Sequence, residues 1–282
     1  MTARILIIAG SDSGGGAGIQ ADIKTVTILG GHAMTAVTAI TAQNTLGVQA
    51  VHQVPTDLVL AQIDSVIGDI GVDAIKIGMI GSAETANAVA DLLTSLFSRE
   101  GGSPVWAPAF AGEQGSAGQH HPERIPIIFD PVMMATSGAT LADPATIEAF
   151  TRLMRIATLV TPNLPELVAL GGEAAIRDFG PALLIKGGHG EGDHVTDRLV
   201  TDDGETRWIN PRIETRHNHG TGCTLASGIA TGLGQGLTLE TAIQRAIAFV
   251  RAALAHAPGL GAGHGPMGHA LGTAPFDDLK DR

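Results

Sequence analysis

The sequence predicts an α/β fold in which a central, mostly parallel β-sheet is covered by helices on both faces. Short apolar runs alternate along the chain with longer stretches whose apolar residues recur at helical spacing. Parallel strands need crossover connections, which are right-handed, so the alternation predicts three layers, α-β-α. The 282 residues suffice to bury a complete core and lie near the upper limit for one domain. We therefore expect residues 1–282 to form a single domain.

The strands are expected where short runs of Val, Ile, Leu or Ala occur, because a strand that is buried on both faces is apolar throughout. These runs lie at residues 5–9, 33–41, 48–54, 74–77, 127–129, 159–160 and 182–185. Two later segments, at residues 195–200 and 207–209, are separated by Asp-Asp-Gly. That spacing predicts a β-hairpin.

Helices are expected between the strands. They are predicted at residues 19–29, 56–66 and 82–97, after Pro144, after Asn163, and at residues 221–232 and 238–256. Thr56 and Ser82 are the expected N-caps of the second and third helices. The expected buried face of the second helix carries Leu58, Ile63, Val66 and Ile67.

The segment at residues 100–124 departs from this pattern. It contains repeated Gly and Pro and shows no apolar period, which predicts a long surface loop. It connects a helix to the following strand, and such connections lie at the edge of a parallel sheet away from the ligand crevice. We interpret it as a flexible insertion that the fold tolerates.

Composition excludes several classes of partner. The net charge of −11 disfavours nucleic acid, and the 3% of aromatic residues, with no Tyr, offer few stacking platforms for single strands. A small anionic substrate is compatible with this charge, because backbone N–H groups can bind phosphate on an acidic protein. A single cysteine excludes an internal disulfide framework. The sequence contains no run of 18 apolar residues, so no membrane-spanning helix is predicted. We expect a cytoplasmic enzyme that acts on a small molecule.

Glycine is in surplus, with 38 residues, and its first cluster joins the first strand to the first helix. Residues 9–22 read Ala-Gly-Ser-Asp-Ser-Gly-Gly-Gly-Ala-Gly-Ile-Gln-Ala-Asp. The spacing matches neither the dinucleotide fingerprint G-x-G-x-x-G nor the P-loop. Glycines at such a turn allow a ligand to approach the backbone closely, so we favour a ligand site over a plain flexible turn.

Two further motifs predict a phosphate site. Lys186-Gly-Gly-His follows a predicted parallel strand, where a Lys points into the ligand crevice. Residues 219–224, His-Gly-Thr-Gly-Cys-Thr, open an apolar helix whose N-terminal N–H groups can bind an anion. Cys223 lies in that first turn, where we expect a lowered thiol pKa. His189 alone carries a weak signal, and His217 and His219 are interpreted as loop residues.

Two carboxylates admit two interpretations each. Asn163 and Glu166 have the spacing of a capping box, with Pro165 in the first turn. Glu166 at the crevice could equally hold Mg²⁺ through water. Asp130 ends a predicted strand, where an acid can face a ligand or metal or can cap the next turn. Spacing alone leaves both pairs of alternatives open.

Taken in order, these motifs resemble one family. The resemblance rests on residues 10–22, 41–45, 76–79, 130–133, 161–166, 186–189, 219–224 and 263–265. Together they are similar to the hydroxymethylpyrimidine/phosphomethylpyrimidine kinases of thiamine biosynthesis, which are ribokinase-like proteins. The resemblance covers nearly the whole chain except about residues 100–124. It implies ATP-dependent phosphorylation of 4-amino-5-hydroxymethyl-2-methylpyrimidine, then of its monophosphate, and it suggests a homodimer.

The resemblance also implies roles for individual residues. The pyrimidine pocket would be formed by Gln43, Gly10, Asp22 and Met79. ATP would be bound by Lys186, Asn163, Gly187 and Thr221. Mg²⁺ and its waters would be positioned by Asp130 and Glu166. The anion hole for the transferring phosphoryl group would consist of Gly220, Thr221 and Gly222.

Cys223 stands where most of the wider superfamily has an Asp base, as it does in this kinase branch. A thiolate could accept the hydroxyl proton, or phosphoryl transfer could proceed with little help from a base. Two departures from the family pattern are the insertion and Thr136, where relatives often carry Lys.

Three rival functions share part of this evidence. A pyridoxal/pyridoxine kinase would have the same fold, ATP site and anion hole, although Gln43 and Met79 favour the pyrimidine. A nicotinamide-dependent oxidoreductase is disfavoured because G-x-G-x-x-G is missing. A non-catalytic pyrimidine-binding relative would bind the pyrimidine without releasing ADP.

Overall fold

The computed structural model describes residues 2–97 and 125–271, and it confirms the predicted α/β class. An eight-stranded sheet runs in the order β10-β9-β8-β7-β6-β5-β1-β2. Its parallel strands are β1 (Arg4–Ala9), β2 (His32–Val37), β5 (Ala74–Ile77), β6 (Ile127–Phe129), β7 (Leu159–Val160) and β8 (Ala182–Ile185). At one edge, β9 (His194–Thr201) and β10 (Gly204–Pro211) form the predicted hairpin and continue the sheet in antiparallel fashion.

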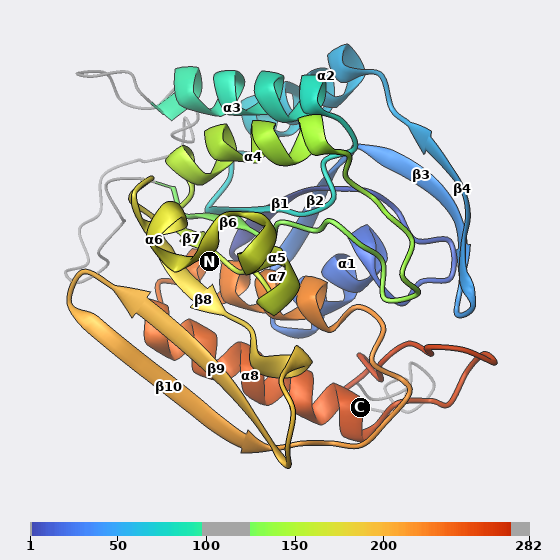
Figure 1. Cartoon of the computed structure of the whole chain (residues 1–282). Helices are drawn as coiled ribbons and strands as arrows, with labels where there is room; N and C mark the ends of the chain where they lie inside the picture. The colour runs from blue at the N-terminus through green and yellow to red at the C-terminus, as the bar shows by residue number, and fades with distance from the viewer. Residues whose placement is uncertain (1, 98–124, 272–282) are drawn as a thin grey trace, which may run out of the picture.

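Helices cover both faces of the sheet (Figure 1). One layer consists of α2 (Thr56–Asp69), α3 (Ala83–Phe97) and α4 (Pro144–Ile156). The other consists of α1 (Gly18–Ile28), α7 (Thr221–Gly234) and α8 (Leu239–Ala255). The short helices α5 (Leu164–Ala169), α6 (Gly172–Arg177) and η1 (Gly187–His189) lie in the connections on either side of β8. The described part of the chain has no helix that is long and apolar enough to cross a membrane.

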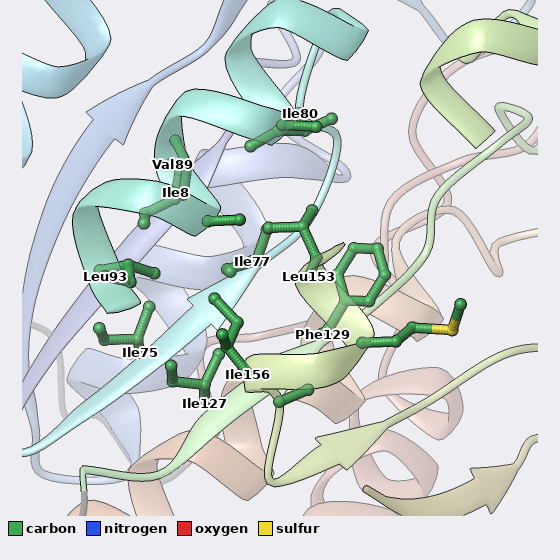
Figure 2. Packing of buried hydrophobic residues seen from close by; sticks show 14 of the residues in the cluster. Ile8, Ile75, Ile77, Ile80, Val89, Leu93, Ile127, Phe129, Leu153 and Ile156 are labelled. Atoms are coloured by element: carbon green, nitrogen blue, oxygen red, sulfur yellow. The ribbon is translucent and has the colours of Figure 1, made fainter. Parts of the chain in front are cut away.

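The sheet separates two hydrophobic cores. Successive side chains of a strand point to opposite faces, so each strand contributes to both cores. In β1, Leu6 and Ile8 join the core under α2, α3 and α4, whereas Ile5 and Ile7 join the core under α7 and α8. Figure 2 shows the first of these cores, where Ile8, Ile77 and Ile127 of the sheet face α3 and α4. Because both faces are buried, these strands are apolar throughout, as predicted.

The expected strand at residues 33–41 is wrong, because the chain forms two strands that belong to different sheets. β2 ends at Val37, and β3 (Ala39–Asn44) pairs only with β4 (Gly47–Gln53) as an antiparallel ribbon. Thr38 marks the break: its N–H donates to the Ala9 carbonyl, and its hydroxyl donates to the Met79 carbonyl. The ribbon stands at one side of the molecule (Figure 1), and the residues of β4 are largely exposed.

The second helix differs from its prediction at its start and in its buried face. Pro55, not Thr56, occupies the N-cap of α2, and the Thr56 hydroxyl instead lies 3.0 Å from that of Thr85. Leu58 is 53% exposed, while its neighbour Val59 is fully buried. The buried residues of the helix recur every fourth position, at Val59, Ile63 and Ile67. The predicted Ser82 cap is confirmed, since its hydroxyl accepts from the Thr85 N–H. The insertion predicted at residues 100–124 lies entirely outside the described residues.

Replacement of Phe150 tests the core under α4. Its ring is fully buried and meets the Phe129 ring edge-on at 5.1 Å between centroids. We expect Phe150→Ala to lower the free energy of unfolding by about 3–5 kcal/mol, measured by urea denaturation. Leu58→Ala, at an exposed position of α2, is the control and should cost less than about 1 kcal/mol. Equal losses for the two variants would contradict the packing described.

Candidate active site

A cavity of about 990 Å³ opens at the carboxyl ends of the parallel strands. The residues that follow four of these strands line it: Gly10 after β1, Met79 after β5, Asp130 after β6 and Lys186 after β8. Parallel α/β sheets bind ligands at this edge, because the strand ends and the following loops converge there. The N-terminus of α7 forms another part of its wall.

Lys186 lies between two carboxylates in the middle of this cavity. Its Nζ is 2.6 Å from Oδ1 of Asp130 and 3.7 Å from Oε2 of Glu166. Burial lowers the pKa of Lys186, but the two negative charges outweigh that effect, so the pKa stands above its ordinary value. Lys186 is therefore a fixed cation at neutral pH. The predicted convergence of these three residues at one edge of the sheet is confirmed.

Glu166 forms the predicted helix cap and also lies on the cavity wall. Asn163 and Glu166 form a complete capping box at the start of α5, each side chain accepting from the other's backbone N–H at 2.8 Å. The same carboxylate lines the cavity and faces Lys186. Burial, together with the nearby Asp130, raises the pKa of Glu166 despite the opposing effect of Lys186. The helix cap thus fixes the carboxylate in its place on the cavity wall.

Asp130 and Glu166 keep one oxygen each for a ligand. Among the described residues, Oδ2 of Asp130 and Oε1 of Glu166 form no hydrogen bond, whereas the other oxygen of each is engaged. Within that part of the chain no three His, Cys, Asp or Glu residues gather as a complete metal site. Two carboxylates fit a magnesium ion that keeps several waters and shares the phosphates of a substrate.

The first turn of α7 faces Lys186 and Asp130. A methyl group at Gly222 would lie 3.3 Å from Nζ of Lys186 and 3.5 Å from Oδ2 of Asp130. The first N–H groups of a helix lack intrahelical partners and carry the positive end of the helix dipole. Gly220, the N-cap, has φ of +88° and packs against the glycine-rich loop, where a Cβ would lie 1.9 Å from the Gly16 carbonyl oxygen. The predicted helix-terminal anion site therefore lies beside the Lys186 cation.

The glycine-rich loop after β1 wraps around the carboxylate of its own residue Asp12. The Asp12 carboxylate accepts hydrogen bonds from the N–H groups of Gly14, Gly16 and Ala17 at 2.8–2.9 Å. Its Oδ2 also lies 2.9 Å from Nε2 of His219. Burial raises the pKa of Asp12, but these hydrogen bonds outweigh it and the pKa is lowered overall. Three N–H groups of the loop are thus occupied by Asp12, while Gly10 and Gly18 line the cavity, where a ligand is expected to approach the backbone.

Gln43 of the β3–β4 ribbon reaches the cavity beside Gly10 and Met79. Its amide has a neighbour on each side: Oε1 accepts from the Thr41 hydroxyl at 3.3 Å, and Nε2 lies 3.2 Å from Nε2 of His219. A Cβ at Gly10 would lie only 3.0 Å from the Met79 sulfur, so these two residues are packed together. Three of the four residues expected to form the pyrimidine pocket therefore lie at one end of the cavity.

Asp22, the fourth, lies behind the cavity wall. It is fully buried and does not line the cavity. Its carboxylate accepts from Nζ of Lys76 at 2.9 and 3.1 Å and from the Ser227 hydroxyl at 2.7 Å. Asp22 points into the protein because α1 packs against α7, and the wall position belongs to Lys76 of β5. In this structure Asp22 is therefore not on the cavity wall where the pyrimidine pocket is expected, and Lys76 separates it from the cavity.

The expected lowering of the Cys223 thiol pKa is wrong. Burial raises the pKa of Cys223 to about 11, and the nearby carboxylates Asp22 and Asp130 act in the same direction. Lys76 and a hydrogen bond from the Gly18 N–H oppose this shift without cancelling it. The helix N-terminus alone does not decide the thiol's state, because the surrounding cations are each paired with a carboxylate.

The sequence matches the family described as phosphomethylpyrimidine kinase over residues 12–117 and 116–268. It is 43% identical over 285 residues to a hydroxymethylpyrimidine/phosphomethylpyrimidine kinase of Streptomyces coelicolor, covering 95% of each chain. The chain belongs to the phosphomethylpyrimidine kinase family. It is an enzyme of the kinase class with a ribokinase-like fold.

Solved structures agree with this family membership. A phosphomethylpyrimidine kinase from Clostridium difficile is similar with a TM-score of 0.69 and 31% identity, over 89% of this chain and 98% of that one. A Staphylococcus aureus pyridoxal kinase in complex with AMP-PCP and pyridoxal is similar with a TM-score of 0.77 and 28% identity, over 96% and 95% of the two chains.

Sequence reasoning missed three residues of this kinase's site. Asp12 and His219 hold the glycine-rich loop and Gln43, and Lys76 is a fully buried cation on the cavity wall. Thr136 lies 3.1 Å from Nδ1 of His219, so the position where relatives often carry Lys adjoins this histidine. The motif at residues 76–79 contained the signal for Lys76, since a lysine inside an apolar strand needs a buried partner.

Replacement of Gly220 separates backbone strain from contact with the loop. Gly220→Ala places a Cβ against Gly16, whereas Gly236→Ala has a similar φ of +84° with open space around the Cβ. Both variants should lose about 1–2 kcal/mol of stability from the left-handed conformation. We expect only Gly220→Ala to weaken ADP binding, by more than about tenfold, in a calorimetric titration. Unchanged affinity in folded Gly220→Ala would contradict the anion site.

Alkylation of Cys223 reports its protonation directly, because it is the single cysteine of the chain. Only the thiolate reacts, so with a pKa of about 11 the iodoacetamide rate should rise about tenfold per pH unit up to at least pH 9.5. A small-molecule thiol with a pKa of about 8.5, measured in parallel, should level off across the same range. A plateau below pH 9 for the protein would show that the thiol is activated.

Proposed function

We propose that this protein uses ATP to phosphorylate 4-amino-5-hydroxymethyl-2-methylpyrimidine and then its monophosphate, supplying the pyrimidine diphosphate for thiamine biosynthesis. The observation that carries the proposal is the order of chemical groups along one cavity. The strand order places Lys186, after β8, between Gln43, which lies beside the loop after β1, and an apolar wall from β9 and the segment after β10. The N-terminus of α7 lies beside Lys186, and residues of α8 also belong to the apolar wall. A phosphate donor and an alcohol acceptor can meet at the middle.

The apolar wall suits a nucleobase. It is formed by Val195, Ile213, Ile247, Val250 and Leu254. Flat aromatic bases bury well against aliphatic side chains, and the polyphosphate would then extend toward Lys186. ATP use is also in keeping with the AMP-PCP bound to the similar pyridoxal kinase. Gln43 at the opposite end offers both a donor and an acceptor, which matches the edge of an aminopyrimidine.

Phosphoryl transfer in this cavity would depend on positioning and on stabilisation of charge. The helix N–H groups of residues 220–222 and the Lys186 ammonium would bind the transferring group, whose transition state is loose. Cys223 is protonated at neutral pH with a pKa of about 11, so it does not start the reaction as a strong base. We therefore favour the alternative in which the acceptor hydroxyl needs little help from a base.

Mg²⁺ fits the donor set of Asp130 and Glu166. When bound, it would neutralise charge on the nucleotide phosphates. The two carboxylates would hold it largely through water, and the capping box would keep Glu166 in position. We also propose a cytoplasmic homodimer, as the family resemblance suggests.

Pyridoxal is the second candidate acceptor, because the similar Staphylococcus aureus enzyme binds it. The amide of Gln43 favours the pyrimidine, whose exocyclic amine and ring nitrogen present a donor beside an acceptor. Comparison of kcat/KM for the two alcohols with the same enzyme preparation decides between them. A higher value for pyridoxal would replace the proposed substrate and leave the kinase class unchanged.

A coupled ADP-release assay with Mg-ATP and the hydroxymethylpyrimidine tests the proposal. Tight binding of the pyrimidine without ADP release would instead indicate a non-catalytic relative.

We expect Gln43→Leu to raise KM for the pyrimidine by about 10–100-fold, because the polar edge of the substrate loses its partner. KM for ATP should stay within about twofold. The matched control is Gln49→Leu, an exposed glutamine of the same ribbon whose amide contacts only that ribbon. Equal effects of the two variants would contradict the pocket.

A further inference from the structure

Arg212 directly follows β10 and lies on the cavity wall, and neither the sequence motifs nor the proposed mechanism assigns it a role. Its guanidinium donates three hydrogen bonds, all to backbone carbonyls of one loop. Nε donates to Gly192 at 2.9 Å, Nη1 to Gly188 at 3.1 Å and Nη2 to Gly190 at 2.7 Å. Its own N–H donates to the Asp193 carbonyl at 2.7 Å, which fixes the base of the side chain.

The loop that Arg212 holds begins immediately after Lys186. Gly188 and His189 of this loop line the cavity. On its other side the loop is held by Asp197, whose Oδ1 accepts from the Gly187 N–H at 2.9 Å. Gly187 is pressed so closely against β9 that a Cβ would lie 2.1 Å from the Thr196 carbonyl oxygen. The loop is therefore fixed between β9 and Arg212, and few other shapes are open to it.

The partners of Arg212 indicate what it is for. In the described part of the chain no carboxylate forms an ion pair with it, unlike Arg198 on the neighbouring strand, which pairs with two glutamates. A planar guanidinium can span several acceptors at fixed angles, which an ammonium group cannot do. The three carbonyl oxygens are neutralised by the guanidinium, which lowers their repulsion of a phosphate in the cavity.

We propose that Arg212 is a positioning residue for the nucleotide: it holds the loop at residues 187–192 in the shape that accepts the polyphosphate next to Lys186. This assignment rests on the proposed kinase function. It places the effect on the nucleotide side of the reaction, because the Gln43 end of the cavity contains no part of this loop. It also makes the planar guanidinium, with several N–H donors at fixed angles, the property that nucleotide binding requires, rather than the positive charge alone.

Two variants and one control test the assignment. Arg212→Gln removes both the charge and the planar guanidinium. Arg212→Lys keeps the charge but loses the guanidinium. Arg245→Gln is the control, because Arg245 also donates to a backbone carbonyl, that of Leu29, yet does not line the cavity. ADP affinity is measured by calorimetry and does not require turnover. KM for Mg-ATP and for the pyrimidine is measured separately, and thermal unfolding reports stability.

We expect both Arg212 variants to weaken ADP binding and to raise KM for ATP by about tenfold, the effect of losing a set of charge-assisted hydrogen bonds. KM for the pyrimidine should stay within about twofold, and Arg245→Gln should leave ADP affinity unchanged. A lowered melting temperature with unchanged ADP affinity would overturn the assignment by making the role structural. Full affinity in Arg212→Lys would overturn it in favour of charge alone. Failure of the unsubstituted protein to bind ADP would overturn the proposed function, whereas full ADP affinity in Arg212→Gln overturns only this assignment.

Discussion

The close contact between the start of α7 and the loop before α1 is the constraint on which the rest of the site depends. It joins segments about 200 residues apart, through Gly220 against Gly16 and through Asp12 against His219. Nearby, Ser227 of α7 and Lys76 of β5 both donate to Asp22 of α1. This network fixes the helix N-terminus over the sheet edge. A Cβ at Gly220 would separate the two segments and move the start of α7 away from its place beside Lys186 and Asp130.

Several glycines around the cavity are explained by close contacts of the chain with itself. At Gly16, Gly187 and Gly220 a Cβ would come within 2.5 Å of another segment of the protein. These positions let loops pack on helices and strands around the cavity, which differs from the expectation that their main task is to admit a ligand. Gly222 is the exception, since it faces Lys186 and Asp130. Close packing of backbone against backbone gives a site whose shape is set before any substrate enters.

The sequence predicted the layers well because hydrophobic period is a local property. Strands buried on both faces, such as β1 and β5, are unmistakable runs, and capping residues such as Ser82 and Asn163 specify helix starts by local hydrogen bonds. The break at Thr38 could not be predicted in this way. It depends on contacts with the carbonyls of Ala9 and Met79, which are distant in sequence, while the apolar pattern continues across it. Leu58 shows the same limit, since one step along a helix rotates the buried face by about 100°.

For the site, motifs predicted where Lys186, Asp130, Glu166 and the α7 N-terminus converge, because strand ends of a parallel sheet must meet at one edge. Motifs did not predict electrostatic states, which sum over every neighbour. The helix N-terminus favoured a thiolate at Cys223, but the surrounding charges are nearly balanced. Lys76 is neutralised by Asp22, and Lys186 is shared by Asp130 and Glu166. In that balance the cost of burial decides, and the thiol keeps its proton.

The same balance explains how a cavity in a protein of net charge −11 can accept a polyanion. In the free protein Lys186 is held by two carboxylates, so its charge does not attract phosphate from a distance. Asp130 and Glu166 would hold a divalent cation through their free oxygens, and its charge would weaken the attraction between these carboxylates and Lys186. Lys186 and the N-terminus of α7 would then both act on the phosphates. Under the proposed function, the carboxylates that neutralise Lys186 would therefore also be the groups that make nucleotide binding depend on the divalent cation.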